Sequence, residues 1–141
     1  MAEAQKHSIL IVDDDHMMRE LLKAILRGEG YRIVGEASNG LDAVELCVNQ
    51  RPDLVLLDIN MPKMDGLTAL EEIRKANPSA MVLMVSGEAT MNKVNEAMQK
   101  GASGFVVKPL VPANVLERVR MCCKRKNSYV KGTDAGVVSG G

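Results

Sequence analysis

Residues 54–66 of this 141-residue chain read LVLLDINMPKMDG. Four consecutive apolar residues, Leu54–Leu57, lead directly into the carboxylate of Asp58, and the turn-forming pairs Met61-Pro62 and Asp65-Gly66 follow. A short, continuous apolar run bounded by turn residues is typical of a parallel strand that is buried on both faces. This segment therefore predicts a buried strand that ends at an acid.

Four further apolar runs are similar to this one and lie on either side of it. The series is Ile9–Val12, Ile33–Ala37, Leu54–Leu57, Met81–Val85 and Phe105–Val107, with starts 24, 21, 27 and 24 residues apart. That interval fits one strand plus one crossover helix. Apolar residues at helical spacing fill the gaps, and Pro112 is suited to the first turn of the last helix. The fold we expect is α/β, a doubly wound five-stranded parallel sheet with five helices.

The composition is that of one globular domain, with 46% hydrophobic and 26% charged residues. Eighteen basic residues balance eighteen acidic ones, which argues against a protein that coats nucleic acid or an anionic membrane. The three aromatic residues, Tyr31, Phe105 and Tyr129, are too few for a base-stacking surface. The sequence contains no apolar run of membrane-spanning length, and its three cysteines form no disulfide framework. We do not expect the polar start MAEAQKH to be a signal peptide. We expect a cytoplasmic protein that contacts neither nucleic acid nor membrane directly.

The chain divides by composition into three parts. Residues 1–6 are expected to be an N-terminal extension and residues 7–127 the folded domain. Residues 128–141, SYVKGTDAGVVSGG, are rich in glycine and small side chains and too short to fold alone. We expect this last part to be a flexible tail or the start of a linker.

Polar residues that suit phosphoryl chemistry follow four of the five apolar runs. The carboxyl ends of parallel strands share one edge of a sheet, which should bring together Asp13, Asp14, Asp58, Ser86 and Lys108. Two carboxylates about 4 Å apart repel by about 4 kcal/mol at an effective dielectric constant of about 20. A hard cation such as Mg²⁺ would relieve that repulsion, and beside a hydroxyl and an amine it forms a phosphoryl-handling site.

Each of these residues also has a purely structural interpretation. Asp14 or Asp15 is suited to cap the first helix, and Ser86 to cap the helix that follows it. Asp58 is suited to begin a turn, and Lys108 to be a solvated charge at the edge of the sheet. Taken singly these are the better explanations, but four such positions at one edge favour the joint functional interpretation.

The segments ILIVDDD, LVLLDINMPKMDG, LMVSGE and GFVVKP closely resemble the signature motifs of the response-regulator receiver domain of two-component signalling. Their order and spacing match, and the resemblance covers about residues 7–126. It is greatest to single-domain chemotaxis and phosphorelay regulators, and it implies a flavodoxin-like receiver fold. By this resemblance Asp58 is the phosphoacceptor, and Mg²⁺ is held by Asp13, Asp14, Asp58 and the backbone carbonyl of Asn60.

The resemblance also implies the residues that bind and sense the phosphoryl group. Ser86 matches the switch hydroxyl, Phe105 the aromatic rotamer switch, and Lys108 the lysine of the family, which is usually followed by a cis proline. Asn60 and Glu88 occupy the two positions that tune dephosphorylation in the family.

The function that this resemblance implies is a phosphorylation-controlled signalling module that promotes only its own aspartyl phosphorylation and dephosphorylation. The expected phosphoryl donor is a sensor histidine kinase or a histidine phosphotransfer protein, and an output protein or a homodimer mate would bind the Thr90–Lys126 face. The alternative is an N-terminal receiver fragment of a longer regulator. Two rivals fit poorly: a dehalogenase-like phosphatase needs an acid where Asn60 stands, and the acids Asp13–Asp15 would repel the phosphate of a flavodoxin-type FMN.

Overall fold

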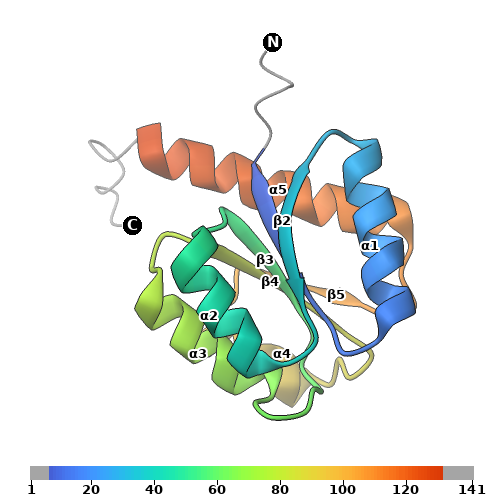
Figure 1. Ribbon diagram of the computed structural model, residues 1–141, viewed down its shortest axis with the longest axis vertical. Coiled ribbons are helices and arrows are strands. Elements are labelled where there is room, and N and C mark those ends of the chain that lie inside the picture. Colours follow the sequence, from blue (N-terminus) through green and yellow to red (C-terminus); the bar gives the residue numbers. More distant parts are fainter. Residues whose placement is uncertain (1–6, 132–141) are drawn as a thin grey trace.

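The computed structural model describes residues 7–131, which form one parallel sheet between two layers of helices (Figure 1). The strands are β1 Ser8–Val12, β2 Arg32–Ala37, β3 Leu54–Leu57, β4 Met81–Ser86 and β5 Gly104–Val107. The helices are α1 His16–Gly28, α2 Gly40–Gln50, α3 Gly66–Ala76, α4 Met91–Gln99 and α5 Pro112–Lys131. The strand order is β2-β1-β3-β4-β5 and every neighbouring pair is parallel. The doubly wound, five-stranded fold expected from the sequence is confirmed.

The two faces of the sheet bury separate hydrophobic clusters. On one face Ile9 of β1 packs with Leu22 of α1 and Val119 of α5. On the other face Leu10 packs with Leu70 of α3 and with residues of α2 and α4. Successive residues of a strand point to opposite faces, and both faces are covered here, so both must be apolar. This explains why the runs are continuous rather than alternating.

The strand order reverses between β1 and β3, and this reversal positions the acids. The chain leaves β1 toward β2 at one edge of the sheet and later returns on the other side of β1 as β3. The amide of Asp58 donates to the carbonyl of Val12 at 3.0 Å, so β3 ends in register with β1. In open α/β sheets ligands bind at this reversal point, beyond the carboxyl ends of the strands.

The helix caps decide which acids are free for another role. The side chain of Asp15 accepts hydrogen bonds from the first-turn amides of α1 and is the N-cap of this helix. Of the two candidates that the sequence offered, Asp14 and Asp15, it is therefore Asp15 that caps α1. The N-cap of α4 is Thr90, not Ser86. Asp14 and Ser86 are therefore not used as caps for these two helices.

Helix α5 begins at the expected Pro112 and ends at Lys131, four residues beyond the boundary that we expected at residue 127. No glycine or proline interrupts residues 113–131, so the helix continues into the segment assigned to the tail. The extension at 1–6 and the rest of the tail at 132–141 lie outside the described residues. Within residues 7–131 no helix combines the length and apolarity that a membrane crossing requires.

The loop from β3 to α3 folds back tightly against the end of its own strand. The amide of Gly66 donates to the carbonyl of Ile59 at 2.6 Å. A Cβ at Gly66 would overlap the carbonyl oxygen of Asp58 and the Cα of Ile59, which are backbone atoms that cannot turn aside. Only glycine fits here, and the close approach fixes the loop that carries Asp58.

We expect Gly66→Ala to lower the free energy of unfolding by about 1–3 kcal/mol, because the added methyl group overpacks a backbone contact. Gly28→Ala is the matched control, since a Cβ at Gly28 meets nothing within 4 Å. Urea denaturation of both variants measures the difference. Equal stability of the two variants would show that the loop adjusts without cost.

Candidate functional site

Three carboxylates meet where β1 and β3 end. The oxygens of Asp13, Asp14 and Asp58 lie within 4.8 Å of one another. Asp13 and Asp58 are only 1% and 5% exposed, whereas Asp14 is open to solvent. Such a group is unfavourable without a cation because buried like charges repel strongly. The convergence predicted from the strand ends is confirmed for these three residues.

Asp13 is held by hydrogen bonds on every side. Its amide donates to the carbonyl of Ala37 at 3.1 Å. One carboxylate oxygen accepts from the amide of Asp15 at 2.9 Å, and the other accepts from the ammonium group of Lys108 at 2.8 Å. The carboxylate therefore has a fixed direction before any ligand binds.

Lys108 brings the positive charge to this group of acids. Its Nζ lies 2.8 Å from an oxygen of Asp13 and 3.6 Å from an oxygen of Asp58. Burial lowers the pKa of the Lys108 ammonium group, but its hydrogen bond and attraction to Asp13, aided by Asp58, outweigh burial and raise the pKa above its ordinary value. Lys108 is thus a paired cation rather than a solvated edge charge. The Lys108–Pro109 peptide is cis, as the family resemblance implied.

Asp58 is a buried acid whose charge Lys108 compensates only in part. Burial and the charge of Asp13 raise its pKa from 3.8 to about 6, although Lys108 opposes this rise. The carboxylate remains mostly ionised at neutral pH and is therefore available as a nucleophile. Its unrelieved charge also makes it a strong ligand for a cation or for an electrophile.

The donor set fits a hard divalent cation. It consists of carboxylate oxygens only, two of them buried and one exposed, with no sulfur or imidazole among the residues grouped there. Mg²⁺ prefers such oxygen ligands and keeps several waters, for which the exposed side of Asp14 leaves room. Asn60, whose carbonyl is the fourth expected ligand, lies exposed two residues beyond Asp58.

The expected switch hydroxyl lies at the buried end of β4. Ser86 is fully buried, and its Oγ accepts a hydrogen bond from the amide of Glu88 at 3.1 Å. This bond ties the strand end to the loop that leads to Thr90, the N-cap of α4. Glu88 itself is exposed. Any displacement of the Ser86 hydroxyl therefore either breaks the bond or moves the loop before α4.

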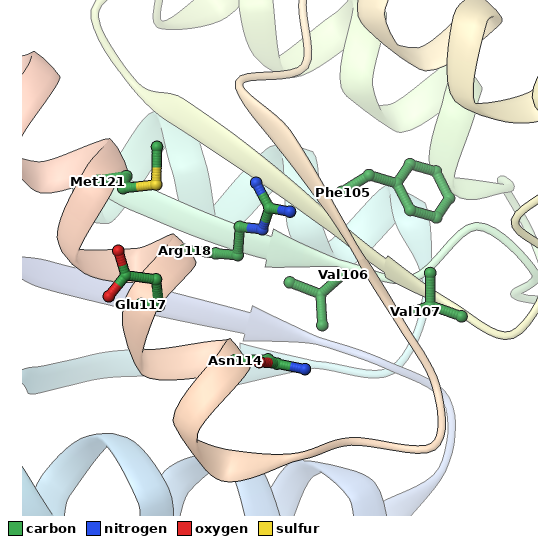
Figure 2. Close-up of a pocket in the computed structure, with 7 residues that line it drawn as sticks. All are labelled: Phe105, Val106, Val107, Asn114, Glu117, Arg118 and Met121. Carbon is green, nitrogen blue, oxygen red and sulfur yellow. The ribbon is translucent and has the colours of Figure 1, made fainter.

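Phe105 lies on β5, beside a hollow of about 440 Å³ between β5 and α5 (Figure 2). The side chain is half-buried and packs against the core cluster on the α2–α4 side of the sheet. Figure 2 shows Arg118 and Met121 extending from α5 along the same hollow. The aromatic ring is therefore neither a closed core residue nor a fully exposed one.

One residue that contacts the site is absent from the sequence-based prediction. Arg19 of α1 donates from Nη1 to the backbone carbonyl of Asp13 at 2.7 Å and from Nε to Glu36 at 2.8 Å. No sequence motif predicts this contact, because its acceptor is a backbone carbonyl, which every residue has. The available signal was the position of Glu36 near the end of β2, at the same edge of the sheet as the acids.

Comparison with known proteins gives one consistent result. Residues 9–120 match the family model of the response regulator receiver domain. The chemotaxis protein CheY of Bacillus subtilis is 46% identical over 113 residues, which cover 80% of this chain and 94% of that protein. CheY of Thermotoga maritima is 42% identical over 116 residues, or 82% of this chain and 97% of the relative.

A solved structure agrees with these relatives. The crystal structure of the CheX-CheY-BeF3-Mg+2 complex from Borrelia burgdorferi contains a chain with a TM-score of 0.79 and 40% identity to this one. The match covers 81% of this chain and 87% of that one. The family match, the relatives and the strand-end geometry lead to the same conclusion: this chain belongs to the response-regulator receiver domains, the CheY-like signalling modules of two-component systems.

Proposed function

We propose that Asp58 accepts a phosphoryl group from a phosphohistidine of a sensor histidine kinase or a histidine phosphotransfer protein. The observation that carries this proposal is the meeting of Asp13, Asp14 and Asp58 within 4.8 Å, with Lys108 as their paired cation. Asp13, Asp14, Asp58 and the Asn60 carbonyl would hold Mg²⁺. A chain similar to this one belongs to the CheX-CheY-BeF3-Mg+2 complex from Borrelia burgdorferi, which supports Mg²⁺ as the cation.

The proposed reaction is one displacement at phosphorus. A carboxylate oxygen of Asp58 forms a bond to phosphorus while the phosphorus–nitrogen bond of the phosphohistidine breaks, and the histidine nitrogen keeps the electron pair. Bound Mg²⁺ would neutralise charge on the phosphoryl oxygens. Lys108 supplies a second positive charge from the side of β5, and Asp13 keeps it in place through the 2.8 Å contact.

In this proposal the protein acts on itself alone. It promotes the gain and loss of its own phosphoryl group, and Asn60 and Glu88, exposed on the loops beyond Asp58 and Ser86, tune that loss. We place the protein in the cytoplasm. Its three cysteines are free and buried, which suits a reducing compartment.

The proposed switch begins at Ser86. A hydrogen bond from its hydroxyl to a phosphoryl oxygen would draw the end of β4 toward Asp58, and the bond between the Ser86 Oγ and the Glu88 amide would pull the loop before α4 in the same direction. Phe105 on the neighbouring strand β5 would then turn into the vacated space, because it is only half-buried now.

The proposed output surface is the Thr90–Lys126 face, formed by α4, β5 and α5. It exposes several apolar side chains, among them Met91 at 78% and Val107 at 51%. Helix α4 buries only one residue, Ala97, so few contacts oppose its displacement. Exposed apolar side chains next to a weakly buried helix suit an output protein or a second receiver.

The charged side chains of this face indicate which groups a partner would present to it. Lys100 is already paired with Glu71, and Arg120 with Glu117. Among the described side chains no ion pair with an acid involves Lys93 or Arg118. Of the four basic residues Lys93, Lys100, Arg118 and Arg120, we therefore expect Lys93 and Arg118 to meet acids of a partner.

The first test of the acceptor is covalent. We expect acetyl phosphate with Mg²⁺ to add one phosphoryl group to the wild-type protein, detected by intact-mass spectrometry and removed by hydroxylamine as an acyl phosphate must be. Asp58→Asn should gain none. Asp65→Asn is the matched control: Asp65 is the N-cap of α3, and asparagine caps equally well, so this variant should be modified like wild type. Modification of Asp58→Asn to the wild-type level would disprove the assignment.

The second test uses the raised pKa of Asp58. A carboxyl whose pKa is about 6 in the folded state and 3.8 otherwise lowers stability as the pH rises through that interval. In EDTA at about pH 7.5, Asp58→Asn should therefore unfold with a free energy about 3 kcal/mol above wild type. The gap should close as the pH falls toward about 3, below both pKa values, where Asp58 is protonated in both states.

Magnesium supplies the control for this pH experiment. Mg²⁺ should raise the melting temperature of wild type by mass action and that of Asp58→Asn much less, because the variant lacks one ligand. A variant that is less stable than wild type at every pH would contradict the claim that the acids repel one another.

The third test follows the signal to the output face. Beryllofluoride with Mg²⁺ mimics the phosphoryl group, and we expect it to shift the amide resonances of residues 86–110. In Ser86→Ala the shifts close to Asp58 should persist while those of α4 and β5 shrink, because the hydroxyl that moves the loop is missing. Shifts confined to the neighbourhood of the acids in wild type would show that this face does not switch.

A further inference from the structure

The main chain of Asp13 is attached at both ends to the end of β2. Its amide donates to the carbonyl of Ala37 at 3.1 Å. Its carbonyl accepts from Nη1 of Arg19 at 2.7 Å, and Nε of the same guanidinium donates to Glu36 at 2.8 Å. Arg19 thus links the loop of the acids to the residue next to Ala37. Only 15% of its side chain is exposed.

Glu36 is itself held in place. Nζ of Lys23 lies 2.7 Å from the second oxygen of Glu36 and 2.6 Å from Glu20. The hydrogen bonds from Lys23 and Arg19 keep the pKa of the Glu36 carboxyl below its ordinary value. The fixed carboxylate of Glu36 therefore holds the guanidinium group of Arg19, so that Nε and Nη1 of Arg19 occupy defined positions.

The carbonyl that Arg19 binds belongs to the peptide that joins Asp13 to Asp14. A peptide is planar, so a fixed carbonyl also fixes the nitrogen of Asp14 and narrows the direction in which its side chain leaves the loop. The Asp14 carboxylate is exposed and makes no hydrogen bond to the described residues that would orient it instead. Its orientation depends on the main chain.

We propose that Arg19, anchored by Glu36, is a positioning residue for the metal ligands Asp13 and Asp14. This inference rests on the proposed function, because it assumes that these acids hold Mg²⁺. An arginine suits the task because its planar fork donates to a carbonyl and a carboxylate at once. A lysine in its place has one nitrogen and cannot hold both acceptors in the same geometry.

The experiment compares Mg²⁺ affinity, by isothermal titration calorimetry, with the stability of the metal-free protein, by urea denaturation. Arg19→Gln should bind Mg²⁺ about tenfold more weakly than wild type, the size usual for groups that orient metal ligands. Arg19→Lys should recover part of that loss. Arg27→Gln is the matched control, since it removes the same charge from the opposite end of α1 and should leave the affinity unchanged.

A double-mutant cycle tests the anchor. Glu36→Leu should weaken Mg²⁺ binding in the wild-type background and add little in Arg19→Gln, because both changes release the same contact. Glu36→Gln keeps an oxygen that accepts from the Nε of Arg19 and should bind Mg²⁺ more tightly than Glu36→Leu. In amide spectra of the metal-free protein, Arg19→Gln should shift Asp14 strongly, and Arg27→Gln should not.

The outcomes separate the two proposals. If wild type binds Mg²⁺ and Arg19→Gln binds it equally well, with only the metal-free stability lowered, Arg19 is merely structural and the inference is wrong while the proposed function stands. Loss of a positive charge by itself would favour Mg²⁺ binding, so equal weakening in Arg27→Gln would show that the effect is not specific to the Arg19 contact and would also overturn the inference. If wild type itself does not bind Mg²⁺, the proposed function fails and the inference fails with it.

Discussion

The ion pair between Lys108 and Asp13 is the contact on which the rest of the site depends. It joins the ends of β5 and β1, which are 95 residues apart in the sequence, across a distance of 2.8 Å. Asp13 is almost completely buried, so removing Lys108 would leave an uncompensated charge, a loss of about 3–5 kcal/mol in comparable buried pairs. One cation beside three acids is nevertheless too little. The site is stable enough to fold and still short of positive charge, which is the condition for binding a cation and a phosphoryl group.

The energetic conflict is confined to one edge of the sheet. Below that edge the three central strands, β1, β3 and β4, are packed almost without exposure. Above that edge, burial raises the pKa of Asp58 to about 6. Ionising this carboxylate therefore costs more free energy in the folded chain than in the unfolded chain, and it lowers the stability of the fold at neutral pH. A ligand that neutralises the acids recovers this free energy on binding. The repulsion between the acids therefore both lowers the stability of the fold at this edge and raises the affinity of the site for a cation. The fold remains stable because the sheet beneath the site is tightly packed.

Much of this arrangement follows from the sequence, and the limits have physical reasons. The continuous runs such as Leu54–Leu57 predict parallel strands, and parallel strands bring their carboxyl ends together, so the meeting of Asp13, Asp58 and Lys108 could be derived. The raised pKa of Asp58 could not, because it depends on burial and on oxygen–oxygen distances. The hydrogen bond from Arg19 to the backbone carbonyl of Asp13 was also missed, because a pattern of side chains does not indicate which backbone carbonyls accept a hydrogen bond from a side chain. Helix α5 continues four residues beyond residue 127, where we expected the tail to begin because glycine and small side chains are frequent in residues 128–141.

The small number of buried residues in α4 has a consequence for the local fluctuations of the molecule. Local opening becomes easier as buried contacts become fewer, and α4 buries a single residue, whereas α3 buries five. Its amides should therefore exchange with solvent long before those of the strands, through fluctuations that leave the sheet intact. A partner that binds α4 restricts these fluctuations, so part of the binding free energy goes into stiffening the helix. Substitutions that pack α4 more firmly would make the domain more robust and its signal weaker, which sets a limit on how stable a responsive receiver of this design becomes.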